Sequence, residues 1–91
     1  MSVLAKYSKD PDSTLDFSID WADWIGTDTI SLSKWIIPGD LTITNQSNSS
    51  TKATVWLKGG VAGKTYYVVN RITTSGGRVD DRTLEIRAEH K

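Results

Sequence analysis

Residues 15–30 read Leu15-Asp16-Phe17-Ser18-Ile19-Asp20-Trp21-Ala22-Asp23-Trp24-Ile25-Gly26-Thr27-Asp28-Thr29-Ile30. Apolar and polar residues alternate strictly from Leu15 to Asp20, which is the period of a strand with one buried face. The period then breaks, and the Asp20 carboxylate can cap a short helical turn over Trp21–Ile25. Gly26 can end that turn with a positive φ, and a second strand pattern begins at Thr29. The stretch therefore predicts a strand, a helical turn and another strand.

The rest of the chain repeats short strand patterns between turn residues. These patterns cover residues 29–37, 41–44, 51–57, 65–74 and 78–88, and the turns between them are rich in Gly, Pro, Asn and Ser. The inward parity changes near Ser33–Lys34, after Ile30 and Leu32, and again at Asp80–Asp81, and each change predicts a β-bulge. No long segment has a helical period. We therefore expect an all-β protein, an Ig-like or fibronectin III-like antiparallel β-sandwich of six or seven strands.

One further detail supports a Greek-key sandwich. A glycine-rich turn separates Leu57 from Tyr66, which comes early in the penultimate strand pattern. In such folds a tyrosine early in that strand bonds back to the preceding connection. The order predicts a tyrosine corner at Tyr66.

Ninety-one residues make a single domain. Residues 1–13 show no sustained period and are expected to form an N-terminal arm, either disordered or ordered against a neighbouring subunit. Residues 14–91 are expected to form the sandwich. The N-terminus lacks the apolar run of a signal peptide, so we expect a soluble protein made in a cytoplasm.

Composition excludes most chemistries. The chain has no cysteine and a single histidine, His90, so disulfides, Cys-based zinc sites and triad chemistry are not expected. Eleven basic and eleven acidic residues give no net charge, and no basic stripe indicates nucleic-acid binding. No segment is long enough to cross a bilayer. We expect no enzyme, no catalytic residue and no cofactor.

Four aspartates near the opening stretch could in principle bind calcium at one end of a sandwich. They are Asp16, Asp20, Asp23 and Asp28. Their spacing fits no EF-hand loop, and capping or a solvated strand face accounts for them. The sequence therefore predicts no metal site.

The four tryptophans divide by their neighbours. Trp24 and Trp35 are flanked by apolar residues and are expected in the core or at its ends. Trp56 shares a strand face with Lys58 and is expected to be exposed, as aromatic residues at interfaces are. Alternatively, Trp56 covers the second layer of the sandwich or packs under Tyr67 across the sheet. The candidate interface residues are Trp56, Tyr67, Trp21 and Lys58.

Several blocks of the sequence form a recognisable set: Lys9-Asp10-Pro11, the run from Leu15 to Trp24, Asp28-Thr29-Ile30, Trp35, Ala53 to Leu57, Gly59-Gly60, Gly63, Tyr66, Gly77-Arg78 and Asp81-Arg82. Together these blocks resemble a family of small phage and prophage proteins, the fiber-tail adaptors or tail accessory proteins. The resemblance covers about residues 9–88. It implies an Ig-like structural part of the virion at the tail or neck, with no catalytic residues.

The expected function is therefore that of a non-enzymatic structural protein of a phage or prophage particle. Its partners would be other tail, neck or fiber proteins, with a possible homo-oligomer, and neither nucleic acid nor a membrane. It would be made in the cytoplasm of a bacterial host. The alternatives are a carbohydrate-binding sandwich that uses Trp56 and Tyr67, and a calcium-dependent adhesion domain.

Overall fold

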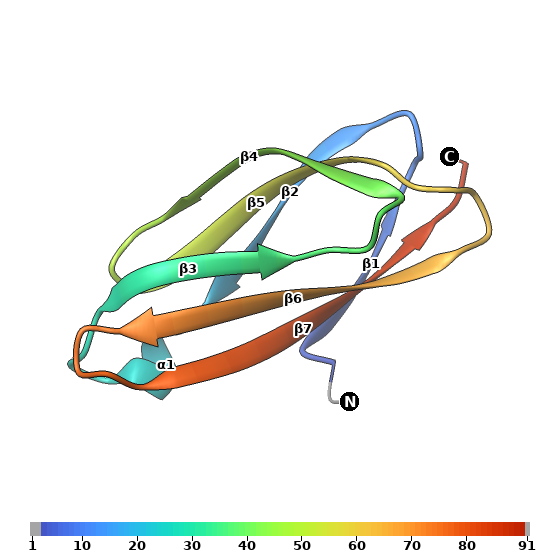
Figure 1. Ribbon diagram of the computed structural model, residues 1–91. Coiled ribbons are helices and arrows are strands. Elements are labelled where there is room, and N and C mark those ends of the chain that lie inside the picture. Colours follow the sequence, from blue (N-terminus) through green and yellow to red (C-terminus); the bar gives the residue numbers. More distant parts are fainter. Residues whose placement is uncertain (1–2, 91) are drawn as a thin grey trace.

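The computed structural model describes residues 3–90, which form seven strands and one short helix in two packed sheets (Figure 1). The elements are β1 (Ala5–Lys9), β2 (Thr14–Asp20), α1 (Ala22–Ile25), β3 (Ile30–Ile36), β4 (Leu41–Asn48), β5 (Lys52–Gly59), β6 (Thr65–Thr74) and β7 (Val79–Ala88). The four-stranded sheet has the order β1-β7-β6-β3, and the three-stranded sheet has the order β2-β5-β4. The expected β-sandwich is confirmed.

The first strand differs from the other strands in its pairing. β1 runs parallel to β7, with Ala5 opposite Leu84 and Lys9 opposite Ala88, whereas the remaining pairs are antiparallel. It lies in the four-stranded sheet, while the next strand, β2, lies in the three-stranded sheet. Residues 5–9 of the segment expected to be an arm thus extend one sheet at its edge.

The core lies between the two sheets, where the alternating residues of each strand meet. In β5, Ala53, Val55 and Leu57 are completely buried, while the residues between them face outward. Phe17 and Ile19 of β2 are buried in the same cluster. The other buried apolar residues are Trp21, Ile25, Ile30, Trp35, Leu41, Tyr66, Val68, Ile72, Leu84, Ile86 and Ala88. The strand patterns correctly predicted the inward positions of β5, of Phe17 and Ile19 in β2 and of Leu84 and Ile86 in β7, because one side of each strand is buried. Leu15, expected on the same side as Phe17, is 40% exposed.

The parity change in β3 occurs earlier than the sequence predicts. The register with β6 shifts between Ile30 and Leu32, not at Ser33–Lys34. Ile30 and Trp35 therefore face the core, and Leu32 lies on the outer surface with 60% of its side chain exposed. The expectation that Leu32 points inward is wrong, because the extra residue of the bulge precedes it.

The bulge predicted at Asp80–Asp81 is also wrong. The register between β6 and β7 is continuous from Thr65 opposite Arg87 to Thr73 opposite Val79. Val79 lies on the outer face with 58% exposure, whereas Leu84 and Ile86 are completely buried on the inner face. The apolar residue at the start of β7 is therefore an exposed one, and its different parity requires no register shift.

β4 is longer than the predicted strand over residues 41–44. It continues to Asn48, and its register with β5 shifts between Ile43 and Asn45. Beyond the shift the residues of β4 are polar and exposed, and a sequence of this kind is typical of a loop. Pairing with β5 supplies the backbone hydrogen bonds that extend the strand.

The predicted tyrosine corner is confirmed, and the predicted helical turn is confirmed in part. The Tyr66 hydroxyl donates to Asp40 Oδ2 at 3.0 Å and accepts from the Val61 N–H at 2.7 Å, which makes the expected tyrosine corner. In the predicted helical turn, Gly26 ends α1 with a φ of 60°, as expected. The expected cap by Asp20 is wrong: α1 begins one residue later, Trp21 is at the N-cap position, and no side chain caps the helix. Asp20 Oδ1 instead accepts from the Ala22 N–H at 2.9 Å, two residues ahead.

Candidate functional site

The outer face of the three-stranded sheet is polar and carries one exposed tryptophan. Trp56 is 38% exposed and lies between Asp16 on β2 and Asn45 on β4, with Lys58 two residues further along the same strand. Nearby on this face, the hydroxyl groups of Ser18 and Thr54 are hydrogen-bonded at 2.9 Å. The arrangement offers one flat aromatic ring with a cation, a carboxylate and an amide around it.

Tyr67 lies on the other side of the molecule. It is exposed on β6, in the four-stranded sheet, and both residues that flank it in the strand are less exposed than Tyr67. Trp56 and Tyr67 therefore point away from each other on opposite outer faces. The alternative that Trp56 packs under Tyr67 is wrong, and the two rings cannot contact one small carbohydrate.

Trp21, the third candidate interface residue, is completely buried. Its indole Nε1 donates to Asn70 Oδ1 at 2.9 Å, and the Asn70 amide nitrogen donates to Ser33 Oγ at 3.0 Å and to the Lys34 carbonyl at 3.2 Å. Trp21 thus joins α1 to β6 and β3 and does not reach the surface. The sequence does hold a signal for the hydrogen-bond partner of Trp21, because Asn70 is the one amide among the inward positions of β6.

Two arginines bind the end of the sandwich where α1 lies: Arg78 in the β6–β7 hairpin and Arg82 in β7. The Arg82 guanidinium lies 4.3 Å from the centroid of the Trp21 ring and donates to the Asp20 carbonyl at 3.0 Å. Arg78 lies 4.7 Å from the centroid of the Trp24 ring and donates to the Ile25 carbonyl at 2.8 Å. Stacked guanidinium groups with backbone partners stabilise this end by packing and cation–π attraction. Trp21 and Trp24 therefore stabilise the fold through these arginine contacts.

Asp28 belongs to the same end of the sandwich. Hydrogen bonds from the Thr74 side chain and the Thr29 N–H lower the pKa of its carboxyl group, and the Gly76 N–H and Arg78 add to the effect. These bonds tie the β6–β7 hairpin to the loop before β3. Its carboxylate is thus engaged in holding the hairpin.

The four aspartates weighed as calcium ligands do not converge within residues 3–90. Asp20 binds the Ala22 N–H, Asp28 holds the hairpin, and Asp16 lies on the outer face beside Trp56. Another group does meet: ligand atoms of Asp10, Asp12 and His90 lie within 4.8 Å of one another. No sequence pattern indicates this group, because its members come from opposite ends of the chain.

A buried lysine lies beside that group. Lys9 is only 1% exposed, and its Nζ donates to the carbonyls of Asp10 and Gly59, each at 2.9 Å. Burial lowers the pKa of the amino group, and the charges of Asp10 and Asp12 partly oppose that shift. Lys9 fastens the end of β1 to the end of β5 across the sandwich, and its positive charge disfavours a second cation nearby.

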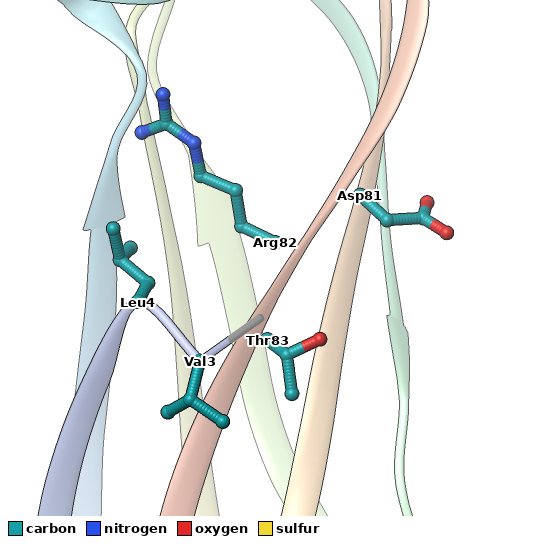
Figure 2. A pocket seen from close by; sticks show the side chains of 5 residues that line it. All are labelled: Val3, Leu4, Asp81, Arg82 and Thr83. Atoms are coloured by element: carbon teal, nitrogen blue, oxygen red, sulfur yellow. The ribbon is translucent and has the colours of Figure 1, made fainter. Parts of the chain in front are cut away.

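One open hollow of about 350 Å³ lies where β1 begins beside β7 (Figure 2). Val3, Leu4, Asp81, Arg82 and Thr83 line it. Figure 2 shows that Asp81 and Arg82 point to opposite sides of β7. Asp81 is bound by a neighbouring arginine and Arg82 stacks on a tryptophan, so both charged side chains that line the hollow are engaged in the fold.

In the part of the chain that the structure describes, no helix is long and apolar enough to span a membrane.

The chain was compared with curated proteins and with models of protein families. A search of the curated proteins found no match to the chain. The family model described as "Podophage GP4 fiber-tail adaptor protein gp77" matches residues 9–87. The match extends from the last residue of β1 almost to the end of β7 and so includes both sheets and the tryptophan–arginine end. The chain therefore belongs to the family of the podophage GP4 fiber-tail adaptor protein gp77.

Proposed function

We propose that this protein is a structural part of a phage or prophage particle that connects tail and fiber components through protein–protein contacts, without catalysis. The family match over residues 9–87 carries the proposal. The protein would be made in the cytoplasm of the bacterial host and reside in the virion. Its partners would be other tail, neck or fiber proteins, with neither nucleic acid nor a membrane.

The distribution of side chains supports this role. Several groups that could act as acids or bases are engaged in the fold: Asp28 holds a hairpin, Lys9 binds two carbonyls, and Asp40 accepts from the tyrosine corner. Two broad outer sheet faces remain for contact with other proteins. A rigid sandwich with engaged polar groups suits a connector.

We assign the contact with another virion protein to the outer face of the three-stranded sheet. Trp56 is the large ring on this face, and Lys58, Asp16 and Asn45 around it can pair with polar groups of a partner. Tryptophan at the centre of a polar surround is the composition of an interface hot spot. Removal of such a ring costs about 2 kcal/mol or more, which is roughly thirtyfold in affinity.

The test is deletion of the reading frame, followed by electron microscopy of the purified particles. Particles without the protein should lack tail fibers, and the wild-type gene supplied in trans should restore them. Fibers on the deletion particles would refute the proposed role.

Two variants then test the assigned face. Trp56→Ala should lower the amount of protein on purified particles, as measured by immunoblot, because the central ring of the contact is lost. Val61→Ala is the matched control, because Val61 is also an exposed apolar residue but lies in the loop before β6. Equal incorporation of both variants would contradict the assignment of the contact to this face.

A further inference from the structure

The outer face of the four-stranded sheet is more apolar than that of the other sheet. Its exposed large apolar residues are Leu32, Ile36, Tyr67 and Val79, on three neighbouring strands. Leu32 and Val79 are 60% and 58% exposed. Apolar side chains gathered on one sheet face mark an interaction surface.

The pairing register arranges this face in rows across the strands. From β3 through β6 to β7, three of the rows are Leu32-Thr73-Val79, Lys34-Arg71-Asp81 and Ile36-Val69-Thr83. Each row has β6 at its centre. One row therefore ends in two apolar residues, and the next ends in a cation and an anion.

We propose that a second copy of this chain packs on this face, with a two-fold axis lying along β6. Rotation about this axis keeps the position of each row along the strands and reverses the order of the strands. Each row therefore faces the same row of the second copy, and β3 of one copy lies over β7 of the other. Leu32 then faces Val79 of the second copy, and Lys34 faces Asp81 of the second copy. Both pairs occur twice, as an isologous interface requires.

The charges favour this exchange. Arg71 holds Asp81 of its own copy by two hydrogen bonds, of 2.7 Å from Nε and 2.9 Å from Nη2. The Asp81 carboxylate keeps free lone pairs, which can accept from Lys34 of the second copy. The two Arg71 side chains near the axis are each neutralised by their own aspartate. The row is thus complementary to its own reversed copy, which argues for a second copy as the occupant.

The size of the face sets the expected strength. Three strands about 4.8 Å apart, with four outward positions about 6.7 Å apart on β6, give a projected patch of roughly 400 Å² per copy. Side-chain relief increases the accessible area, so the total buried area approaches about 1,000 Å², the lower limit for a specific interface. We therefore expect a reversible dimer with a Kd on the order of micromolar to tens of micromolar.

The geometry can be tested by sedimentation velocity of the purified chain from about 10 µM to about 1 mM, a range chosen around that affinity. The wild type should shift from monomer to dimer with concentration. Leu32→Lys and Val79→Asp should each weaken dimerisation by about tenfold or more, because each sets a charge against an apolar residue. Both positions are exposed, so far-UV circular dichroism should stay unchanged.

A mixture of the Leu32→Lys and Val79→Asp variants tests the pairing itself. In the mixed dimer, the two introduced groups have opposite charges and face each other at one site, while the other site keeps the natural Leu32–Val79 contact. The mixture should therefore dimerise at concentrations where each variant alone does not. The control Trp56→Ala, on the opposite face, should dimerise as the wild type does.

Three results would overturn the proposal: a wild type that stays monomeric throughout, variants that dimerise as the wild type does, or a mixture that stays monomeric. These outcomes are independent of the particle experiment above, because a monomeric protein could still join fiber and tail.

Discussion

Asn70 offers a sharp test of how the two sheets and α1 are held together. Its side chain is completely buried, accepts from the Trp21 indole, and donates to Ser33 and to the Lys34 carbonyl. Asn70→Leu keeps a similar volume but removes all three hydrogen bonds. The buried indole N–H is then without a partner, which costs about 1–3 kcal/mol, and the carbonyl adds about 1 kcal/mol. We expect a total loss of about 3 kcal/mol.

A loss of this size is large for the chain. A domain of this length is stabilised by about 5–13 kcal/mol. With an m-value of about 1.5 kcal/mol/M, the urea midpoint should fall by about 2 M. Urea unfolding followed by far-UV circular dichroism measures this shift without relying on tryptophan fluorescence. Asn45→Leu, at an exposed asparagine on β4, is the matched control and should change stability by less than about 0.5 kcal/mol.

A double-mutant cycle isolates the bond itself. Trp21→Phe keeps an aromatic ring under Arg82 but removes the indole donor, so the Asn70 oxygen loses its partner. In the variant with both Trp21→Phe and Asn70→Leu neither atom of the pair remains, and the loss should be smaller than the sum of the single losses by about 1 kcal/mol or more. Additive losses, or an Asn70→Leu midpoint equal to that of the control, would refute the reasoning.

Three further changes test other contacts. Tyr66→Phe should lower the free energy of unfolding by about 1–2 kcal/mol, because both hydrogen bonds of the corner hydroxyl are lost, whereas Tyr67→Phe should be neutral in the same urea titration. Gly59→Ala should destabilise by more than about 1 kcal/mol, because φ is 91° and the new Cβ would lie 2.8 Å from a backbone oxygen; Gly39→Ala has open space and should show no comparable fall in melting temperature. The lowered pKa of Asp28 means that its contribution is present above its unfolded pKa, near 3.8, and is lost as the pH falls through its folded pKa. Acid titration of Asp28→Asn should therefore show a smaller loss of stability below about pH 4 than the wild type shows, and parallel curves would exclude this role.

The sheets could be predicted from the sequence because their strands have one buried face. In β5 the alternation alone placed Val55 inward and Trp56 outward, as observed. β1 could not be found in this way. Its inward positions include Tyr7, which is half exposed, and Lys9, whose burial depends on a carbonyl of Gly59 far along the chain. A lysine at an inward position reads as polar, so the period is hidden.

The candidate surface was predictable only in part. Alternation gives the side of a strand on which a residue lies, but it does not give the sheet to which the strand belongs. The opposite placement of Trp56 and Tyr67 is therefore a result of topology. Trp21 follows the end of a strand among aspartates and so resembles a surface residue. Its burial depends on Asn70 and Arg82, which only the folded chain brings to it.

The parallel pairing of β1 with β7 has a mechanical consequence for the proposed connector. The chain enters at the start of β1 and leaves just past the end of β7, at well-separated points (Figure 1). Tension between the two termini pulls these neighbouring strands past each other along their length. The hydrogen bonds between them, from Ala5–Leu84 to Lys9–Ala88, then bear the load in shear and must break together, whereas a hairpin pulled at its open end unzips bond by bond. Force spectroscopy through the termini measures this resistance directly, and we expect the sandwich to rupture in a single step.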